Sequence, residues 1–176
     1  TWVTFKPDPE IFDTDIYDYN TLKVRIRELA FLNKGLRITL RDDRDEEDTT
    51  GETFVYEGGI SEYVKFINNE KTAIHENIIH LEGTEDNVVF EVALQYTNGY
   101  NDNIYSFVNN INTHDGGTHE EGVKRALTRV INSYARKNGI LKEKDDSLSG
   151  EDVKEGLTMI VSCKHPNPQF EGQTKG

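Results

Sequence analysis

The strongest constraint on the fold is the alternation of side chains over residues 87–96. Every second residue from Val88 to Tyr96 is apolar, which is the period of a β-strand with one buried face. A second alternating segment, Leu157–Lys164, ends just before Pro166. Because an apolar strand face must be covered by another layer, the chain is expected to build a core around a sheet.

Four segments carry the signals of helices. Each opens with a capping or turn residue, and three of them continue with apolar side chains three and four positions apart. The longest is expected from Thr118 to Asn138, where Thr118 and Glu121 form a capping-box pattern. The other three follow Asp18 or Asn20, Gly59 and Ser149.

Helices and strands are interspersed along the chain, which separates it from all-helical and all-β classes. Further strands are expected over residues 36–41, 53–56 and 104–111, and the charged run at 42–48 is expected to be a solvated hairpin loop. We therefore predict an α+β fold in which helices cover one face of a mixed sheet. No segment has the composition of an internal linker.

Composition narrows the class of protein. The chain has 176 residues, 30% of them charged, and a net charge of −12, so it binds nucleic acid only if its basic residues are gathered on one surface. It has no apolar run long enough for a membrane span. A single cysteine fits the reducing cytoplasm. The chain lacks an initiator Met, and both ends are expected to be cuts through a longer polypeptide.

Common catalytic motifs are absent from the sequence. It contains no GxGxxG, Walker A, HExxH or GxSxG pattern. His114 and His119 flank a Gly-Gly turn, and Cys163 lies two residues before His165. Zinc centres need three or four ligands at one point, so these two pairs predict no metal site. Cys163 is expected to be a small core residue.

Two segments contain candidate binding residues. Arg125, Arg129 and Arg136 share the side of the long helix opposite its apolar stripe, and arginine suits phosphate contacts. The alternative is a solvated helix face whose arginines pair with carboxylates. Near the end of the chain, Gln173 and Lys175 offer an amide and an ammonium that suit a terminal phosphate. The alternative there is a frayed polar terminus.

Several sequence blocks occur in an order that points to one family. They are Val3–Asp8, Arg27–Leu36, Tyr56–Ile60, Ala93–Tyr96, Ser106–Thr113, Gly116–Glu120, Ala126–Arg129, Gly150–Leu157 and Phe170–Lys175. Together they resemble the ATPase subunits of bacterial type IIA topoisomerases, which are the B subunits of DNA gyrase and of topoisomerase IV. The unbroken Phe31–Gly35 segment within the second block is more similar to gyrase.

The resemblance implies a domain assignment and a fold. Residues 1–6 resemble the last strand of a GHKL-type ATPase domain, and residues 7–176 resemble the transducer domain that follows it. The family's transducer has a ribosomal-protein-like fold with a left-handed βαβ crossover. Its implied role is to couple ATP binding and hydrolysis in the preceding domain to closure of a DNA clamp and strand passage.

The resemblance also implies roles for particular residues. Gln173 and Lys175 match residues that contact the γ-phosphate, and Lys175 would act in catalysis by stabilising charge during phosphoryl transfer. Arg129 matches an arginine that lines the family's DNA channel. The roles of Arg125 and Arg136 are extrapolated from the helical wheel.

Cofactors and partners follow from the same resemblance. ATP and Mg²⁺ would be bound mainly by the preceding domain, so no cofactor is expected in this chain alone, which should be monomeric and without ATPase activity. The implied partners are double-stranded DNA, the A subunit of gyrase and a second copy of the B subunit, in the cytoplasm and without a membrane. The remaining alternatives are a stand-alone DNA-binding or structural module and the B subunit of topoisomerase IV.

Overall fold

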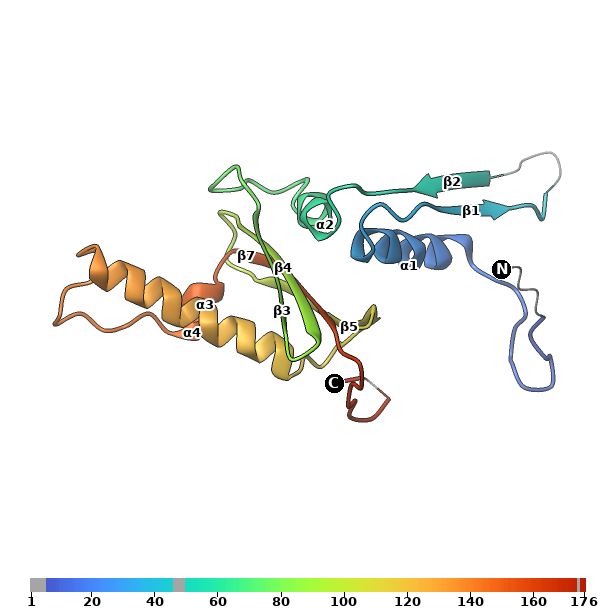
Figure 1. Cartoon of the computed structure of the whole chain (residues 1–176). Helices are drawn as coiled ribbons and strands as arrows, with labels where there is room; N and C mark the ends of the chain where they lie inside the picture. The colour runs from blue at the N-terminus through green and yellow to red at the C-terminus, as the bar shows by residue number, and fades with distance from the viewer. Residues whose placement is uncertain (1–5, 46–49, 174) are drawn as a thin grey trace.

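The computed structural model describes residues 6–45, 50–173 and 175–176, and is built around a five-stranded sheet (Figure 1). The predicted junction strand at residues 1–6 lies almost entirely outside the described residues. In chain order the elements are α1 (Tyr19–Leu32), β1 (Ile38–Asp42), β2 (Thr50–Phe54), α2 (Ile60–Ile67), β3 (Ile79–Glu85), β4 (Val88–Tyr96), β5 (Asn103–Val108), β6 (Ile111–Asn112), α3 (Thr118–Lys137), α4 (Gly150–Lys154) and β7 (Leu157–Lys164).

The sheet is mixed, with the order β3-β4-β7-β5-β6. Strand β7 pairs antiparallel with β4 on one side and parallel with β5 on the other. Every residue of β7 from Leu157 to Cys163 is buried. A central strand covered on both faces needs apolar or small side chains at successive positions, and the sequence LTMIVSC supplies them.

Two hydrophobic cores share this sheet, one on each face. The first gathers Ile160 of β7 and Ala93 of β4 with side chains of α1 and α2. The second gathers Met159 and Leu94 with residues of α3, among them Leu127. Figure 1 accordingly shows α2 and α3 on opposite sides of the sheet.

The predicted α+β class with a mixed sheet is confirmed. The arrangement differs from the prediction in one respect, because helices cover both faces rather than one. The physical reason is that β4 and β7 direct apolar side chains to both faces of the sheet, so neither face could remain in water. The β5-α3-α4-β7 segment forms the expected βαβ unit, and its handedness stays a prediction.

Most predicted element boundaries are confirmed. Asp18 caps α1 by accepting a hydrogen bond of 2.7 Å from the backbone N–H of Thr21. Ser149 and Asp152 form the reciprocal capping box expected at α4. The capping box predicted at α3 is wrong, because Gly117 is the N-cap and Thr118 is already the first helical residue.

Two strand predictions also needed correction. The strand predicted over residues 104–111 is a hairpin, since Asn109 and Asn110 adopt positive φ angles of 50° and 65° and turn the chain between β5 and β6. Strand β3 was not predicted at all. It is the exposed edge of the sheet, so burial had left little pattern in its sequence.

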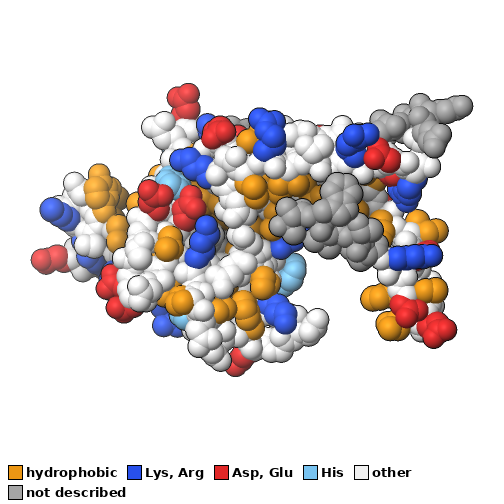
Figure 2. Space-filling model, turned by 45° about the vertical axis from the view of Figure 1, so that its right-hand side comes forward, with side chains coloured by type: hydrophobic (Ala, Val, Ile, Leu, Met, Phe, Trp, Pro, Cys, Tyr) orange, Lys and Arg blue, Asp and Glu red, His pale blue; other side chains and the backbone are white. Residues whose placement is uncertain are grey.

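The surface carries its charges in a dispersed form. On the face shown in Figure 2, acidic and basic side chains are interspersed, so the net charge of −12 is not gathered into one patch there. Within the described residues, every helix is too short or too polar to serve as a membrane span.

One glycine is required by the packing of the loop before β7. Gly156 has a φ of +72°, and a Cβ at this position would lie 2.4 Å from the carbonyl oxygen of Thr97. Gly139 has a similar φ of +68° but open space around it. We expect Gly139→Ala to lower the free energy of unfolding by about 1–2 kcal/mol through backbone strain alone. Gly156→Ala should cost roughly 1–3 kcal/mol more because of the added overlap.

Chemical denaturation of both variants tests this comparison. Equal losses at the two glycines would show that the contact with Thr97 relaxes without cost.

Candidate functional site

The segment after β7 folds back as a closed loop. The backbone N–H of Glu171 donates to the carbonyl of Gly176 at 2.7 Å, and Gly172 and Lys175 both have a φ of 59°. This closure places Gln173 and Lys175 at a cleft of about 420 Å³. The other residues lining the cleft come from α1 and the β5–α3 region: Thr21, Val24, Arg25, Glu28, Ile111, Asn112 and His114.

Hydrogen-bond donors in this cleft differ in their availability. The guanidinium of Arg25 forms an ion pair with Glu28 and donates to the carbonyl of Asn110 at 2.8 Å. Neither Gln173 nor Lys175 has a hydrogen-bond or ion-pair partner within the described residues. The predicted phosphate-binding residues are therefore brought to one cleft without a partner among the described residues, whereas Arg25 holds α1 against the β5–β6 turn.

The loop also packs against the turn that begins α3. A Cβ built at Gly176 would lie 3.6 Å from the Cβ of Asp115 and 3.9 Å from the carbonyl oxygen of Gly116. Phe170, Glu171 and Gly176 share a second cleft, of about 550 Å³, with the first residues of α3. The C-terminal loop and the start of α3 are thus neighbours in space.

A buried hydrogen-bond network fixes the beginning of α3 to β5. The hydroxyl of Ser106 lies 2.7 Å from that of Thr113 and donates to the Glu120 carboxylate at 2.6 Å. The imidazole Nε2 of His119 lies 3.2 Å from the hydroxyl of Thr113. Lys124 completes the network as the ion-pair partner of Glu120.

Burial and pairing shift the pKa values of two groups in this network. Burial lowers the pKa of His119 below its ordinary value, with Glu120 opposing the shift. For Glu120, burial acts to raise the pKa, but hydrogen bonds from Lys124 and Ser106 outweigh it and the pKa is lowered. The network therefore holds a charged carboxylate beside a largely neutral imidazole at neutral pH.

Helix α3, here called the arginine helix because it carries Arg125, Arg129 and Arg136, contributes a second surface. Arg125 and Arg129 line a groove of about 440 Å³ between α3 and α4. Lys124 and Lys154 also line it, but so do Glu121 and Glu151, with which these two lysines form ion pairs. Both arginines are exposed, and neither has an ion-pair partner in the described part of the chain. The alternative that these arginines pair with carboxylates is therefore not what the structure has. Lys154, which the sequence analysis missed, lies on the neighbouring short helix, and helical periodicity within α3 could not reveal it.

Arg136 has a different environment from the other two arginines. Its guanidinium donates to the carbonyl groups of Lys142 and Asp145, each at 3.0 Å, and to the hydroxyl of Ser147 at 2.9 Å. These bonds fasten the loop that connects α3 to α4. Contact of Arg136 with DNA stays a prediction, and its observed bonds give it a structural role.

The two histidine-containing pairs considered for zinc gain no third ligand among the described residues. The one group of three potential ligands found there consists of His80, Glu82 and Glu91 on β3 and β4. Cys163 is buried in β7, and burial raises the pKa of its thiol. It is a core residue, as predicted.

Removing the central hydroxyl of the network provides a test of its contribution. Ser106→Ala should lower the free energy of unfolding at pH 7 by about 1–3 kcal/mol, because Glu120 and Thr113 lose a buried partner. The pKa of Glu120 is lowered in the fold, so its stabilising effect is present above its unfolded pKa and is lost as the pH falls through the folded value. The difference between wild type and variant should therefore narrow in acid, below about pH 4.5.

Denaturation curves at pH 7 and in acid measure this difference. Thr39→Val is the control, because it deletes one hydroxyl of an exposed pair, Thr39 and Thr53 at 2.8 Å, and should cost under about 0.5 kcal/mol. A pH-independent difference for Ser106→Ala would contradict the role assigned to Glu120.

Comparison with known proteins gives a consistent result. A profile described as DNA gyrase B matches residues 59–176. The B subunits of DNA gyrase from Halalkalibacterium halodurans and Bacillus cereus are 57% and 58% identical to this chain over 176 residues, or 99% of its length. The chain spans 27% and 43% of their respective lengths.

Solved structures agree with these matches. The 43K ATPase domain of Thermus thermophilus gyrase B, in complex with an aminocoumarin, superposes with a TM-score of 0.82 at 40% identity, covering 96% of this chain and 45% of that one. The topoisomerase IV ATP-binding domain of Francisella tularensis, in complex with a small-molecule inhibitor, has a TM-score of 0.75 at 26% identity, covering 96% and 44%.

Proposed function

This chain belongs to the DNA gyrase B family, and we propose that it is the transducer domain of a type IIA topoisomerase. In this proposal residues 7–176 couple ATP binding and hydrolysis in a preceding ATPase domain to closure of a DNA clamp and strand passage. The observation that carries the proposal is that the loop bearing Lys175 lies beside the turn that begins the arginine helix.

The nucleotide side of the proposal rests on Gln173 and Lys175. Their side chains line an open cleft without partners among the described residues, so an amide and an ammonium are available to a terminal phosphate. An ammonium placed there stabilises the negative charge that develops during phosphoryl transfer. ATP and Mg²⁺ would be bound mainly by the preceding ATPase domain, and this chain alone would have no ATPase activity.

The DNA side of the proposal rests on Arg125 and Arg129. Their exposed guanidinium groups form no ion pair within the described residues, so they are available to DNA phosphates. The two lysines of the groove, Lys124 and Lys154, are paired with its two glutamates. Such a surface contacts phosphates without reading bases, and a clamp that encloses any DNA segment needs no more than that. The further partners in this proposal are the A subunit of gyrase and a second copy of the B subunit.

A change in the loop that carries Lys175 would reach the groove lined by Arg125 and Arg129 by a short route. The loop lies beside Asp115 and Gly116, which come just before α3, and the Ser106–Glu120 bond ties the first turn of α3 to the sheet. When the loop binds a γ-phosphate it becomes ordered, and when phosphate leaves it is released, so the start of α3 senses the nucleotide state. A stand-alone DNA-binding module would have no use for this arrangement.

The first test joins this chain to its own ATPase domain and measures ATP turnover. Lys175→Ala should lower the turnover rate by about 10²–10³-fold, because it removes a preorganised charge that stabilises the transition state. Nucleotide binding, measured separately, should be retained. The control is Lys71→Ala, which removes an exposed lysine from the loop after α2 and should leave the rate unchanged.

An unchanged turnover rate in Lys175→Ala would show that the loop takes no part in ATP hydrolysis. The function would then have to be sought in the α3–α4 groove. The isolated chain serves as a further check. ATP turnover by this chain alone would contradict the proposal that the preceding ATPase domain is needed for hydrolysis.

The DNA contact is tested by the salt dependence of duplex binding in the same two-domain protein. Arg125→Ala together with Arg129→Ala should weaken binding of all sequences alike, and the slope of log K against log salt should fall by about one for each arginine. Arg37→Ala, an exposed arginine near β1, is the matched control. A slope equal to that of the wild type would place the DNA elsewhere.

A further inference from the structure

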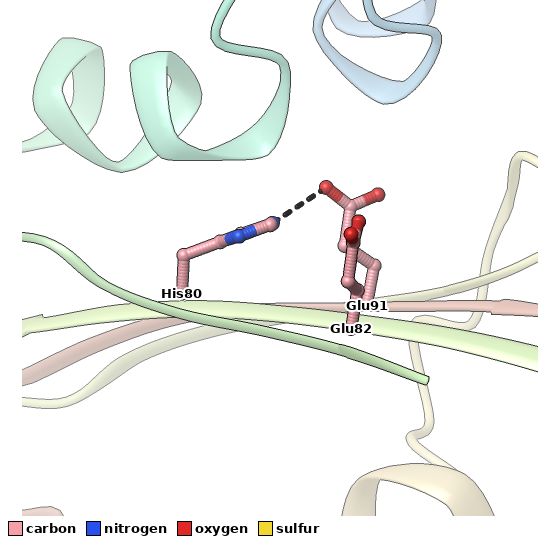
Figure 3. A group of neighbouring side chains, drawn as sticks. All are labelled: His80, Glu82 and Glu91. Atoms are coloured by element: carbon pink, nitrogen blue, oxygen red, sulfur yellow. Dashed lines mark hydrogen bonds and ion pairs between the residues drawn. The ribbon is translucent and has the colours of Figure 1, made fainter. Parts of the chain in front are cut away.

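A group of polar side chains lies on the face of β3 and β4 that looks toward α2, away from the clefts described above. His80 and Glu82 are two residues apart on β3, and Glu91 is the register partner of Glu82 on β4. All three therefore project from the same face. Figure 3 shows the imidazole and the two carboxylates pointing toward one another above the sheet.

The geometry brings three potential ligand atoms together. His80 Nε2 lies 2.8 Å from Glu91 Oε1, and one ligand atom from each of the three residues lies within 4.8 Å of the others. The side chains of His80 and Glu91 are 34% and 27% exposed and Glu82 is exposed, so the group is open to solvent, with the bond to His80 restraining Glu91.

The two carboxylates of this group share a single ion pair within the described residues. Glu82 and Glu91 are directly opposite in the register, and like charges at such positions destabilise a strand pair. Glu82 has no ion-pair partner within the described residues. The nearby cation on the same face, Lys164 of β7, also forms no ion pair among them. In the part of the chain that the structure describes, His80 is the one ion-pair partner of these carboxylates, and it contacts Glu91.

We propose that His80, Glu82 and Glu91 bind a divalent transition-metal ion, with Zn²⁺ as the preferred metal. One imidazole nitrogen and two carboxylate oxygens are zinc ligands with bonds of about 2.0–2.2 Å, which sets neighbouring ligand atoms roughly 3.3 Å apart in a tetrahedron. The ligand atoms now lie within 4.8 Å of one another, so they would close to this spacing as the ion binds, with water in the fourth position. The bound metal replaces the contact between His80 and Glu91. It also attracts both carboxylates, which repel each other when no metal is bound.

The donor set also selects among metals. Mg²⁺ and Ca²⁺ prefer shells made of oxygen, whereas an imidazole nitrogen favours zinc and its neighbours. Because the ligands come from two strands, the bound ion links the exposed edge strand β3 to β4. The site is independent of the proposed energy coupling, since none of its residues lines the phosphate cleft or the arginine groove.

Calorimetric titration of the chain with Zn²⁺ tests the proposal. We expect one ion per chain, with affinity lowered more than about 100-fold in His80→Ala and in Glu82→Gln, since loss of a supporting outer partner alone typically costs 10–100-fold. Glu85→Gln is the matched control. It makes the same change of charge on the same strand, but Glu85 lies on the opposite face and should leave zinc affinity unchanged.

Two further measurements decide the outcome. Zn²⁺ should raise the melting temperature of the wild type and of Glu85→Gln but not of Glu82→Gln, which folds because it only relieves the opposed charges. Millimolar Mg²⁺ should not compete. Equal zinc affinity in Glu82→Gln and the wild type, or displacement of zinc by Mg²⁺, would overturn the proposal and leave an ordinary histidine–glutamate pair.

Discussion

The structure depends on the pairing of β7 with a strand on each side. β7 joins the β3–β4 hairpin to the β5–β6 hairpin, and without it neither hairpin has a further partner among the described strands. It also divides its side chains between the two cores, giving Ile160 to the layer of α1 and α2 and Met159 to the layer of α3. The two helical layers are therefore connected through one close-packed strand. Because such packing leaves little free space, strain on one face is transmitted to the other.

The parallel pairing of β5 with β7 explains why the candidate site forms where it does. Parallel strands end at the same edge of a sheet, so the segments that leave them begin side by side. After β5 and its short partner β6 comes the turn that starts α3, and after β7 comes the loop with Lys175. Residues about sixty positions apart in the sequence meet at this edge, where the proposed phosphate contact lies beside the first turn of the arginine helix.

Local signals in the sequence predicted well, and signals that depend on distant partners did not. The capping box of Ser149 and Asp152 involves neighbouring residues and follows from spacing alone, although the same spacing at Thr118 and Glu121 failed because Gly117 takes the N-cap position. The bond between Ser106 and Glu120 depends on how α3 returns to the sheet, so no spacing could reveal it. Edge strand β3 was missed because it is exposed. Strand prediction relies on an apolar face, and an exposed strand does not need one. The placement of Lys175 came from family resemblance, and residue patterns alone had left a frayed terminus open.

The position of β7 in the chain has a consequence for synthesis of the protein. The strand at the centre of the sheet is the last of the described strands to be made, at residues 157–164. Until it leaves the ribosome, β4 and β5 each present an unpaired edge, and both cores lack their shared wall. A product that stops before this strand would expose those edges and aggregate rather than accumulate as a partly active domain. Completion of the sheet thus comes shortly before synthesis of the loop with Lys175, which follows β7 in the chain.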